Sequence, residues 1–223
     1  DVAGYEQLKV RLLNGTHSLI AYLGALSGAA TIPDSTAVDY IEAAARSILR
    51  HEYLPSVTVP AAVDVDAYET QLFSRWRNSA LGHRTSQVGS DGSVKLRQRI
   101  PLPALQMLDG GAMPHYLALT AAAYLSCIAP LHGFDPGIHA REMQDPARDS
   151  LQRLAAGSAT GNEFAGKVIG QLHLLGDELA TRNDFILRIG EFVDIIHQQG
   201  PLAAARAAAE STALLPAQTR SIQ

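Results

Sequence analysis

The stretch LKVRLLNGTHSLIAYLGALSG, residues 8–28, indicates a helical fold because its apolar residues recur at the spacing of an α-helix. When each residue turns the helix by about 100°, four leucines fall on one side: Leu8, Leu12, Leu19 and Leu23. A helix with one continuous apolar side is typical of a core element in a globular protein. The stretch therefore predicts a buried helix over residues 5–28.

Three polar side chains, Lys9, Asn14 and His17, border the apolar side of this predicted helix. With Lys9 as zero, His17 projects near ~80° and Asn14 near ~140°. Side chains lean toward the N-terminus of a helix, so the three would border one gap of roughly 12 Å. Each also has a structural interpretation, since a lysine at a helix margin reaches solvent and Asn-Gly often marks a turn. Geometry alone leaves both interpretations open.

The same helical periodicity continues along the chain, with glycine- and proline-rich breakers between the segments. We expect helices near residues 36–53, 64–78, 101–108, 115–129, 146–156, 163–175, 184–199 and 201–213. Asp34 and Ser35 are candidate N-caps, and only SVTVP, residues 56–60, resembles a strand. No internal repeat or long linker divides the chain. The sequence predicts an all-α fold, one compact multi-helix domain over residues 1–223.

Composition limits the possible partners and compartment. The 223 residues include 18 basic and 22 acidic side chains, for a net charge of −4, and their scatter gives nucleic acid no continuous basic surface. Cys127 is the only cysteine, which excludes an intrachain disulfide. The longest apolar run, residues 116–131, falls short of the ~20 residues that a membrane span needs. We therefore expect a cytoplasmic protein that binds neither nucleic acid nor a membrane.

Two further patterns are poor matches to known ligand sites. His132, His139 and Glu142 lie close in sequence, but no H-E-x-x-H is present and the segment is rich in glycine and proline. GNEFAGKV, residues 161–168, fits G-x-x-x-x-G-K but ends in Val168 where a phosphate loop needs Ser or Thr. We expect no metal site, and a helix start at residues 161–168. The dinucleotide pattern G-x-G-x-x-G is absent from the chain.

The order K-x-x-x-x-N-x-x-H, formed by Lys9, Asn14 and His17, resembles the catalytic helix of the mannitol dehydrogenase and fructuronate reductase (D-mannonate oxidoreductase) family of long-chain polyol and sugar-acid dehydrogenases. RWRNSALGHRTSQVGSDGSVKLRQR, residues 75–99, and GFDPGIHAREMQDP, residues 133–146, are similar to two further family segments. The resemblance implies a C-terminal helical substrate domain like that of 6-phosphogluconate dehydrogenase. It also implies that an N-terminal Rossmann-like NAD-binding domain is absent from this chain.

The resemblance implies specific roles for the three polar residues. Lys9 would be the base that takes the proton of a secondary alcohol, while Asn14 and His17 would bind the reacting oxygen. An exposed lysine titrates near 10.4, so Lys9 would need desolvation or a neighbouring cation to act at neutral pH. The implied cofactor is NAD, with NADP left open, and the scheme requires no metal. The implied partners are the N-terminal domain and a small polyol, hexonate or hexuronate.

Residues 82–99 are the second candidate site. We expect a broken loop around Gly89 and Gly92, and the resemblance implies that Arg84, Gln87 and Lys95 bind the far end of the substrate. Basic side chains gather there, which favours a substrate carboxylate: Arg84, Lys95, Arg97 and Arg99. The sequence of this segment resembles that of the sugar-acid reductases more than that of the mannitol enzymes, although Arg97 stands where the family has proline. The alternatives are a mannitol or other neutral polyol 2-dehydrogenase, and a non-catalytic helical binding or dimerisation module.

Overall fold

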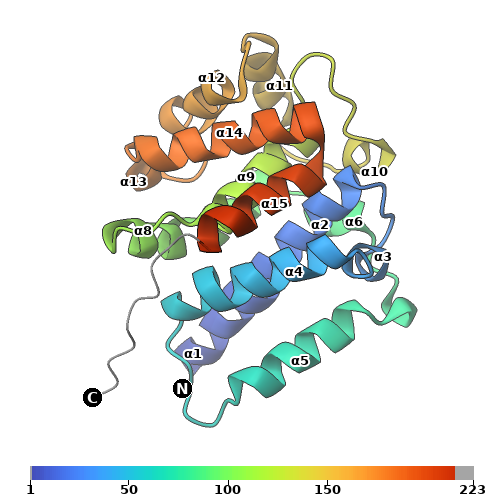
Figure 1. Ribbon diagram of the computed structural model, residues 1–223, viewed down its shortest axis with the longest axis vertical. Coiled ribbons are helices and arrows are strands. Elements are labelled where there is room, and N and C mark those ends of the chain that lie inside the picture. The colour runs from blue at the N-terminus through green and yellow to red at the C-terminus, as the bar shows by residue number, and fades with distance from the viewer. Residues whose placement is uncertain (1, 214–223) are drawn as a thin grey trace.

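The computed structural model describes residues 2–213, and the regular elements of this range are helices (Figure 1). The only extended pairing within it is an isolated antiparallel bridge between Thr31 and Arg84. The all-α prediction is therefore confirmed for these residues. Residue 1 and residues 214–223 of the predicted domain lie outside the described residues.

Two apolar helices, α2 (Thr16–Leu26) and α9 (His115–Ile128), form the centre of the core. They pack against each other, and α9 also packs against α14 (Asn183–Gln199). Residues 116–128 are all buried. The longest apolar run, which is too short to span a membrane, is therefore a helix of the core. No helix within residues 2–213 has both the length and the apolar character to cross a membrane.

The remaining helices form layers on both sides of this centre (Figure 1). On the α14 side lie α11 (Arg148–Ala156), α12 (Gly161–Ala165), η5 (Gly166–Gln171), α13 (Asp177–Ala180) and α15 (Pro201–Ala213). The opposite side holds α1 (Val2–Gln7), η1 (Leu8–Gly15), α4 (Asp39–Ser47), η2 (Ile48–Tyr53) and α5 (Val65–Trp76). Shorter elements connect them: α3 (Ile32–Thr36), η3 (Leu54–Ser56), η4 (Ser79–Leu81), α6 (Thr85–Gly89), α7 (Gly92–Arg99), α8 (Pro101–Asp109) and α10 (Ile138–Arg141).

The N-cap prediction is wrong by one turn. Thr31 is the N-cap of the short helix α3, since its hydroxyl accepts from the backbone N–H of Asp34 at 3.2 Å. The Asp34 carboxylate accepts from the Thr31 N–H at 3.2 Å, which completes a capping box. Asp34 and Ser35 thus lie inside α3, because Pro33 fits the first turn of a helix and lets it begin earlier.

The strand prediction for residues 56–60 is also wrong. Pro55 belongs to the short turn η3, and the N–H of Thr58 donates to Gln7 Oε1 at 3.0 Å instead of to another strand. A strand needs a partner strand, and residues 2–213 contain none. Val57, one of the apolar residues that suggested a strand, packs instead against the helical core.

The expected loop at residues 82–99 consists mainly of two helices, α6 and α7. Gly89 and Gly92 are needed for close packing: a Cβ on Gly92 would lie 2.3 Å from Tyr124 Cε2, and one on Gly89 would lie 2.5 Å from Met143 Cε. The reversal between the helices falls on Asp91, whose φ is +56° and whose N–H donates to Gln144 O at 2.7 Å. The prediction of a broken loop is wrong because local sequence does not show this packing.

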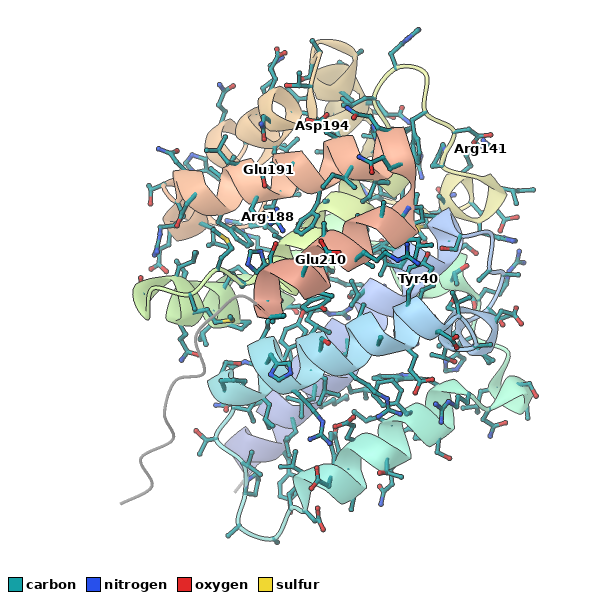
Figure 2. All side chains as sticks on the ribbon, in the orientation of Figure 1. Tyr40, Arg141, Arg188, Glu191, Asp194 and Glu210 are labelled. Carbon is teal, nitrogen blue, oxygen red and sulfur yellow. The ribbon has the colours of Figure 1, made fainter. Side chains whose placement is uncertain are left out.

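Polar contacts connect α14 to the two helices beside it. Arg188 lies over the ring of Phe192 and donates to Ser211 Oγ of α15 at 2.9 Å (Figure 2). On the other side, Asp194 Oδ1 accepts from the N–H of Gly161 in α12 at 2.7 Å. These bonds fix α14 between α12 and α15.

Helices α12 and α14 cross at two glycines, and this crossing gives a stability prediction. A Cβ on Gly190 would lie 2.5 Å from the Cα of Asn162, so Gly190→Ala must push the two backbones apart. We expect a loss of about 1–3 kcal/mol in the free energy of unfolding. Gly166→Ala is the control, because that helical glycine faces open space and alanine should stabilise it by up to ~1 kcal/mol. Urea unfolding measures both, and equal effects would contradict the close crossing.

Candidate functional site

The stretch that carries Lys9 and Asn14 is a π-helix, η1, which continues into α2. In a π-helix each N–H bonds to the carbonyl five residues earlier, so residues five apart share a face. Lys9 and Asn14 are five apart, so this helix brings them closer to one face than an α-helix would. The prediction of a regular α-helix here is wrong. Single π-helical turns are frequent at functional sites.

Gly15 belongs to the helix and not to a turn. Its backbone packs so tightly on the buried ring of Tyr53 that a Cβ would lie 2.3 Å from Tyr53 Cζ. Asn-Gly at residues 14 and 15 therefore reflects a close helix contact, which removes the turn interpretation. Tyr53 ends η2, a second π-helix packed against η1.

Two adjoining cavities open beside this helix, and both are lined by Asn14, His17 and His83. The first has a volume of about 220 Å³ and its further lining is mainly apolar: Leu13, Ile32, Pro33, Arg75, Trp76, Asn78 and Leu81. The second, of about 340 Å³, adds Gln87, Val88, Lys95 and Arg99 from α6 and α7. Four residues that the sequence singled out thus meet at one place: Asn14, His17, Gln87 and Lys95.

The remaining two predicted site residues lie outside the lining of both cavities. Lys9 is exposed and makes no hydrogen bond or ion pair with the described part of the chain. Arg84 is also exposed, and its Nη2 pairs with Glu142 Oε2 at 2.9 Å. Neither side chain is buried in the core. The charge of Arg84 is already neutralised by Glu142, whereas Lys9 has no carboxylate partner among the described residues.

His83 comes from a loop that backbone bonds hold in place. Its carbonyl accepts from the N–H of Ile32 at 2.8 Å, and the N–H of Thr85 donates to Ala30 O at 3.0 Å. The His83 ring lies 6.3 Å from the ring of His17. His83 lies within residues 75–99 but was not predicted as a site residue. Trp76, the tryptophan of RWRN, lines the first cavity together with His83, and it is the residue from which the sequence could have indicated this side of the site.

His17 is a neutral side chain in a cationic surrounding. Its ring stacks on Trp76 with centroids 5.8 Å apart, and its Nε2 is buried without a hydrogen-bond partner within residues 2–213. Burial lowers the pKa of His17 to about 3, and the positive charges of His83 and Arg99 act in the same direction. A neutral imidazole offers one donor and one acceptor at neutral pH.

This pKa gives a pH prediction. Because the folded pKa of about 3 lies below the ordinary 6.5, unfolded His17 binds more protons between these values. The free energy of unfolding should keep its full His17 contribution above pH 6.5 and lose it as the pH falls toward 3. His17→Gln should flatten this dependence in urea unfolding, whereas His51→Gln, at an exposed position, should not. Equal slopes in all three proteins would contradict a buried neutral His17.

Two cations line the second cavity without a carboxylate partner. Lys95 Nζ donates to Ser90 O at 2.6 Å, and Arg99 Nη1 donates to Asn14 O at 3.0 Å and Ser18 Oγ at 2.6 Å. Burial lowers the pKa of both, and Arg99 adds to the effect on Lys95. Desolvated positive charge that makes no ion pair favours an anionic ligand.

The two weak ligand-site patterns gain no support from their geometry. No three His, Cys, Asp or Glu side chains of the described residues come together as a metal site requires. Residues 161–165 begin helix α12 with Thr160 as N-cap, which confirms the helix start. Lys167 pairs with Glu163 at 2.6 Å, so its ammonium is already engaged.

Comparison with known proteins identifies relatives of this chain. A family model described as the mannitol dehydrogenase C-terminal domain matches residues 1–196. D-mannonate oxidoreductase of Escherichia coli is 34% identical over 186 residues, covering 83% of this chain and 37% of that protein. Mannitol 2-dehydrogenase of Pyrenophora tritici-repentis is 30% identical over 207 residues, covering 91% and 34%.

A solved structure has the same fold. It is Pseudomonas fluorescens mannitol 2-dehydrogenase in a ternary complex with NAD and D-mannitol, with a TM-score of 0.81 and 21% identity. The match covers 94% of this chain and 42% of that chain. This chain therefore spans less than half the length of these three proteins.

Proposed function

Because this chain belongs to the mannitol dehydrogenase C-terminal domain family, we propose that it is the substrate domain of an NAD-dependent oxidoreductase. The enzyme would interconvert a secondary alcohol of a sugar acid or polyol and the corresponding ketone. The observation that carries the proposal is the polar cavity where Asn14, His17 and Lys95 meet. Its volume of about 340 Å³ is in the range of small-molecule sites.

Within this proposal Lys9 is the proton acceptor. Oxidation of a secondary alcohol to a ketone moves the proton of the hydroxyl oxygen to a base and the hydride of the carbinol carbon to the nicotinamide of the dinucleotide. The Lys9 amine would take the proton at Nζ. In the reverse direction its ammonium would return that proton. Lys9 is exposed in this chain, and a domain closing over η1 would shield its amine from water, as a base that acts at neutral pH requires.

Asn14 and His17 would bind the reacting oxygen. The Asn14 amide and one imidazole N–H are donors, and donors aimed at an oxygen stabilise the negative charge that it gains as its proton leaves. The unpartnered His17 Nε2 supports this role, because a buried polar atom normally has a partner. Neutral His17 neither competes with Lys9 for the proton nor adds positive charge near its amine.

The dinucleotide would be held outside this chain. Residues 2–213 contain no parallel sheet, and the glycine-rich dinucleotide pattern is absent from the sequence, so these residues do not fit the usual NAD site. We propose that a second domain binds NAD, or NADP, and presents it to the substrate. The greater length of the relatives supports this, as does the NAD in the ternary complex of the Pseudomonas fluorescens mannitol 2-dehydrogenase.

We favour a substrate of the fructuronate or mannonate type. The carboxylate would lie near Lys95, which makes no ion pair with the described residues, and Gln87 would bind a hydroxyl group. Arg84 would contribute less, because Glu142 already pairs with it. A neutral polyol such as mannitol is the alternative, supported by the mannitol 2-dehydrogenases among the relatives.

The experiment that tests this function uses the complete protein, meaning this chain together with the proposed dinucleotide-binding domain. We expect NAD- or NADP-dependent oxidation of at least one member of a panel of D-mannonate, D-altronate and hexitols. The 223-residue chain alone should be inactive and should bind NAD no better than millimolar, because hydride transfer needs both domains. Micromolar NAD binding by the chain alone would contradict the two-domain proposal. No turnover of any panel member would favour a non-catalytic module.

A further inference from the structure

Arg99 connects α7 to the helix that carries the proposed catalytic residues. Its side chain is half-buried, and its Nη1 reaches Asn14 O at 3.0 Å and Ser18 Oγ at 2.6 Å. It makes no ion pair within residues 2–213, although burial lowers its pKa. The cost of burying this charge without a carboxylate partner calls for an explanation beyond helix packing.

The explanation lies at the junction between η1 and α2. A π-helix bonds each carbonyl to the N–H five residues later and an α-helix to the N–H four residues later. The first pattern gives way to the second between Gly15 and Thr16. Asn14 lies one residue before the end of η1, and its carbonyl accepts from two side chains, Arg99 Nη1 and Ser18 Oγ at 3.2 Å.

We propose that Arg99 is a positioning residue that holds this junction through the carbonyl of Asn14, an inference that rests on the proposed function. By donating to Asn14 O, Arg99 stabilises the end of the π-helical stretch that carries Lys9 and Asn14. It also sets the rotation of α2, and with it the direction in which His17 enters the cavity. Arg99 therefore acts through Asn14 and His17 and does not itself bind the reacting oxygen.

The alternative role for Arg99 is recognition of the substrate carboxylate, since it also lines the second cavity. The two roles predict different kinetics. A positioning residue affects turnover of acidic and neutral substrates equally, whereas a carboxylate ligand affects the KM of the acid alone.

Hydrogen exchange on the 223-residue chain tests the contact directly. Arg99→Met should speed exchange of the amides in residues 8–18 by at least about tenfold while amides of α9 and α14 keep their rates. Arg99→Lys should restore part of the protection, because an ammonium can still donate to Asn14 O. Arg97→Met, an exposed neighbour on the same helix, is the control. Circular dichroism checks that each variant folds, and unchanged exchange in both Arg99 variants would overturn the proposal.

Kinetics of the complete protein then separate the two roles. We expect Arg99→Met to lower kcat by about 10- to 100-fold for D-mannonate and for a hexitol, with each KM within about threefold of its original value. Arg99→Lys should recover part of kcat. A raised KM for the acid alone, with kcat unchanged, would overturn positioning in favour of carboxylate binding. If the unmodified protein oxidises neither substrate, the proposed function fails. The hydrogen-exchange result is independent of that outcome: faster exchange in Arg99→Met supports the role of Arg99 at the junction, and unchanged exchange contradicts it.

Discussion

Replacing Lys9 by methionine in the complete protein should lower kcat by about 10²–10⁴ and leave NAD affinity nearly unchanged. Methionine keeps much of the length of the side chain but has no amine to accept the hydroxyl proton. Because the Lys9 side chain is exposed and makes no hydrogen bond or ion pair within residues 2–213, the change should not destabilise the fold. Stopped-flow measurement of the single-turnover rate reports the chemical step directly.

Lys167→Met is the matched control for this experiment. It removes a lysine that pairs with Glu163 near α12, far from η1 in the sequence, and should leave kcat within about threefold. A buffer amine added to Lys9→Ala provides a second check. The amine can replace a missing proton acceptor, but it cannot restore activity that was lost because the fold changed. Unchanged single-turnover rates in Lys9→Met would remove Lys9 from the mechanism.

Replacing Lys95 by methionine should raise the KM for D-mannonate by about 10- to 150-fold, the equivalent of ~1.5–3 kcal/mol for a charged hydrogen bond. The cause is the loss of an ammonium that lines the second cavity without a carboxylate partner. The KM for mannitol should change by no more than about threefold, since a neutral polyol needs no counter-charge. Steady-state kinetics with both substrates measure the difference.

Arg84→Met and Arg97→Met calibrate that result. Arg84 is neutralised by Glu142 and Arg97 is exposed on α7 outside both cavity linings. We expect a smaller rise in the KM for D-mannonate in the Arg84 variant than in the Lys95 variant, and none in the Arg97 variant. Equal losses toward mannonate and mannitol in the Lys95 variant would exclude a carboxylate pocket and favour a neutral polyol.

The core helices were predictable because burial leaves a regular trace in the sequence. Residues 116–128 are apolar on all sides and form the buried α9, and the leucines of residues 8–28 fix the inner side of η1 and α2. Two of the errors fall where a contact distant in sequence decides the outcome. Thr58 bonds to Gln7 instead of a strand, and Gly92 leaves room for the ring of Tyr124.

The site was predictable only in its residue types. Lys9, Asn14 and His17 were identified by their order, but their relative placement depends on the π-helix, which one side chain from η2 and another from α7 support. Eight residues of π-helix leave no periodicity that a sequence could reveal. The proposed role of Arg99 leaves no trace in the sequence, because the partner of its guanidinium is a backbone carbonyl 85 residues away.

A crystal structure of the complete protein with D-mannonate would show where the substrate binds and which groups face its reacting carbon. We expect the substrate to occupy the cavity lined by Asn14, His17 and Lys95, with its carboxylate at Lys95 Nζ. Its reacting hydroxyl should lie within about 3.2 Å of the Asn14 amide, the His17 imidazole and Lys9 Nζ. A substrate bound away from Asn14 and His17, or a Lys9 ammonium turned away from the reacting carbon, would contradict the proposed catalytic roles.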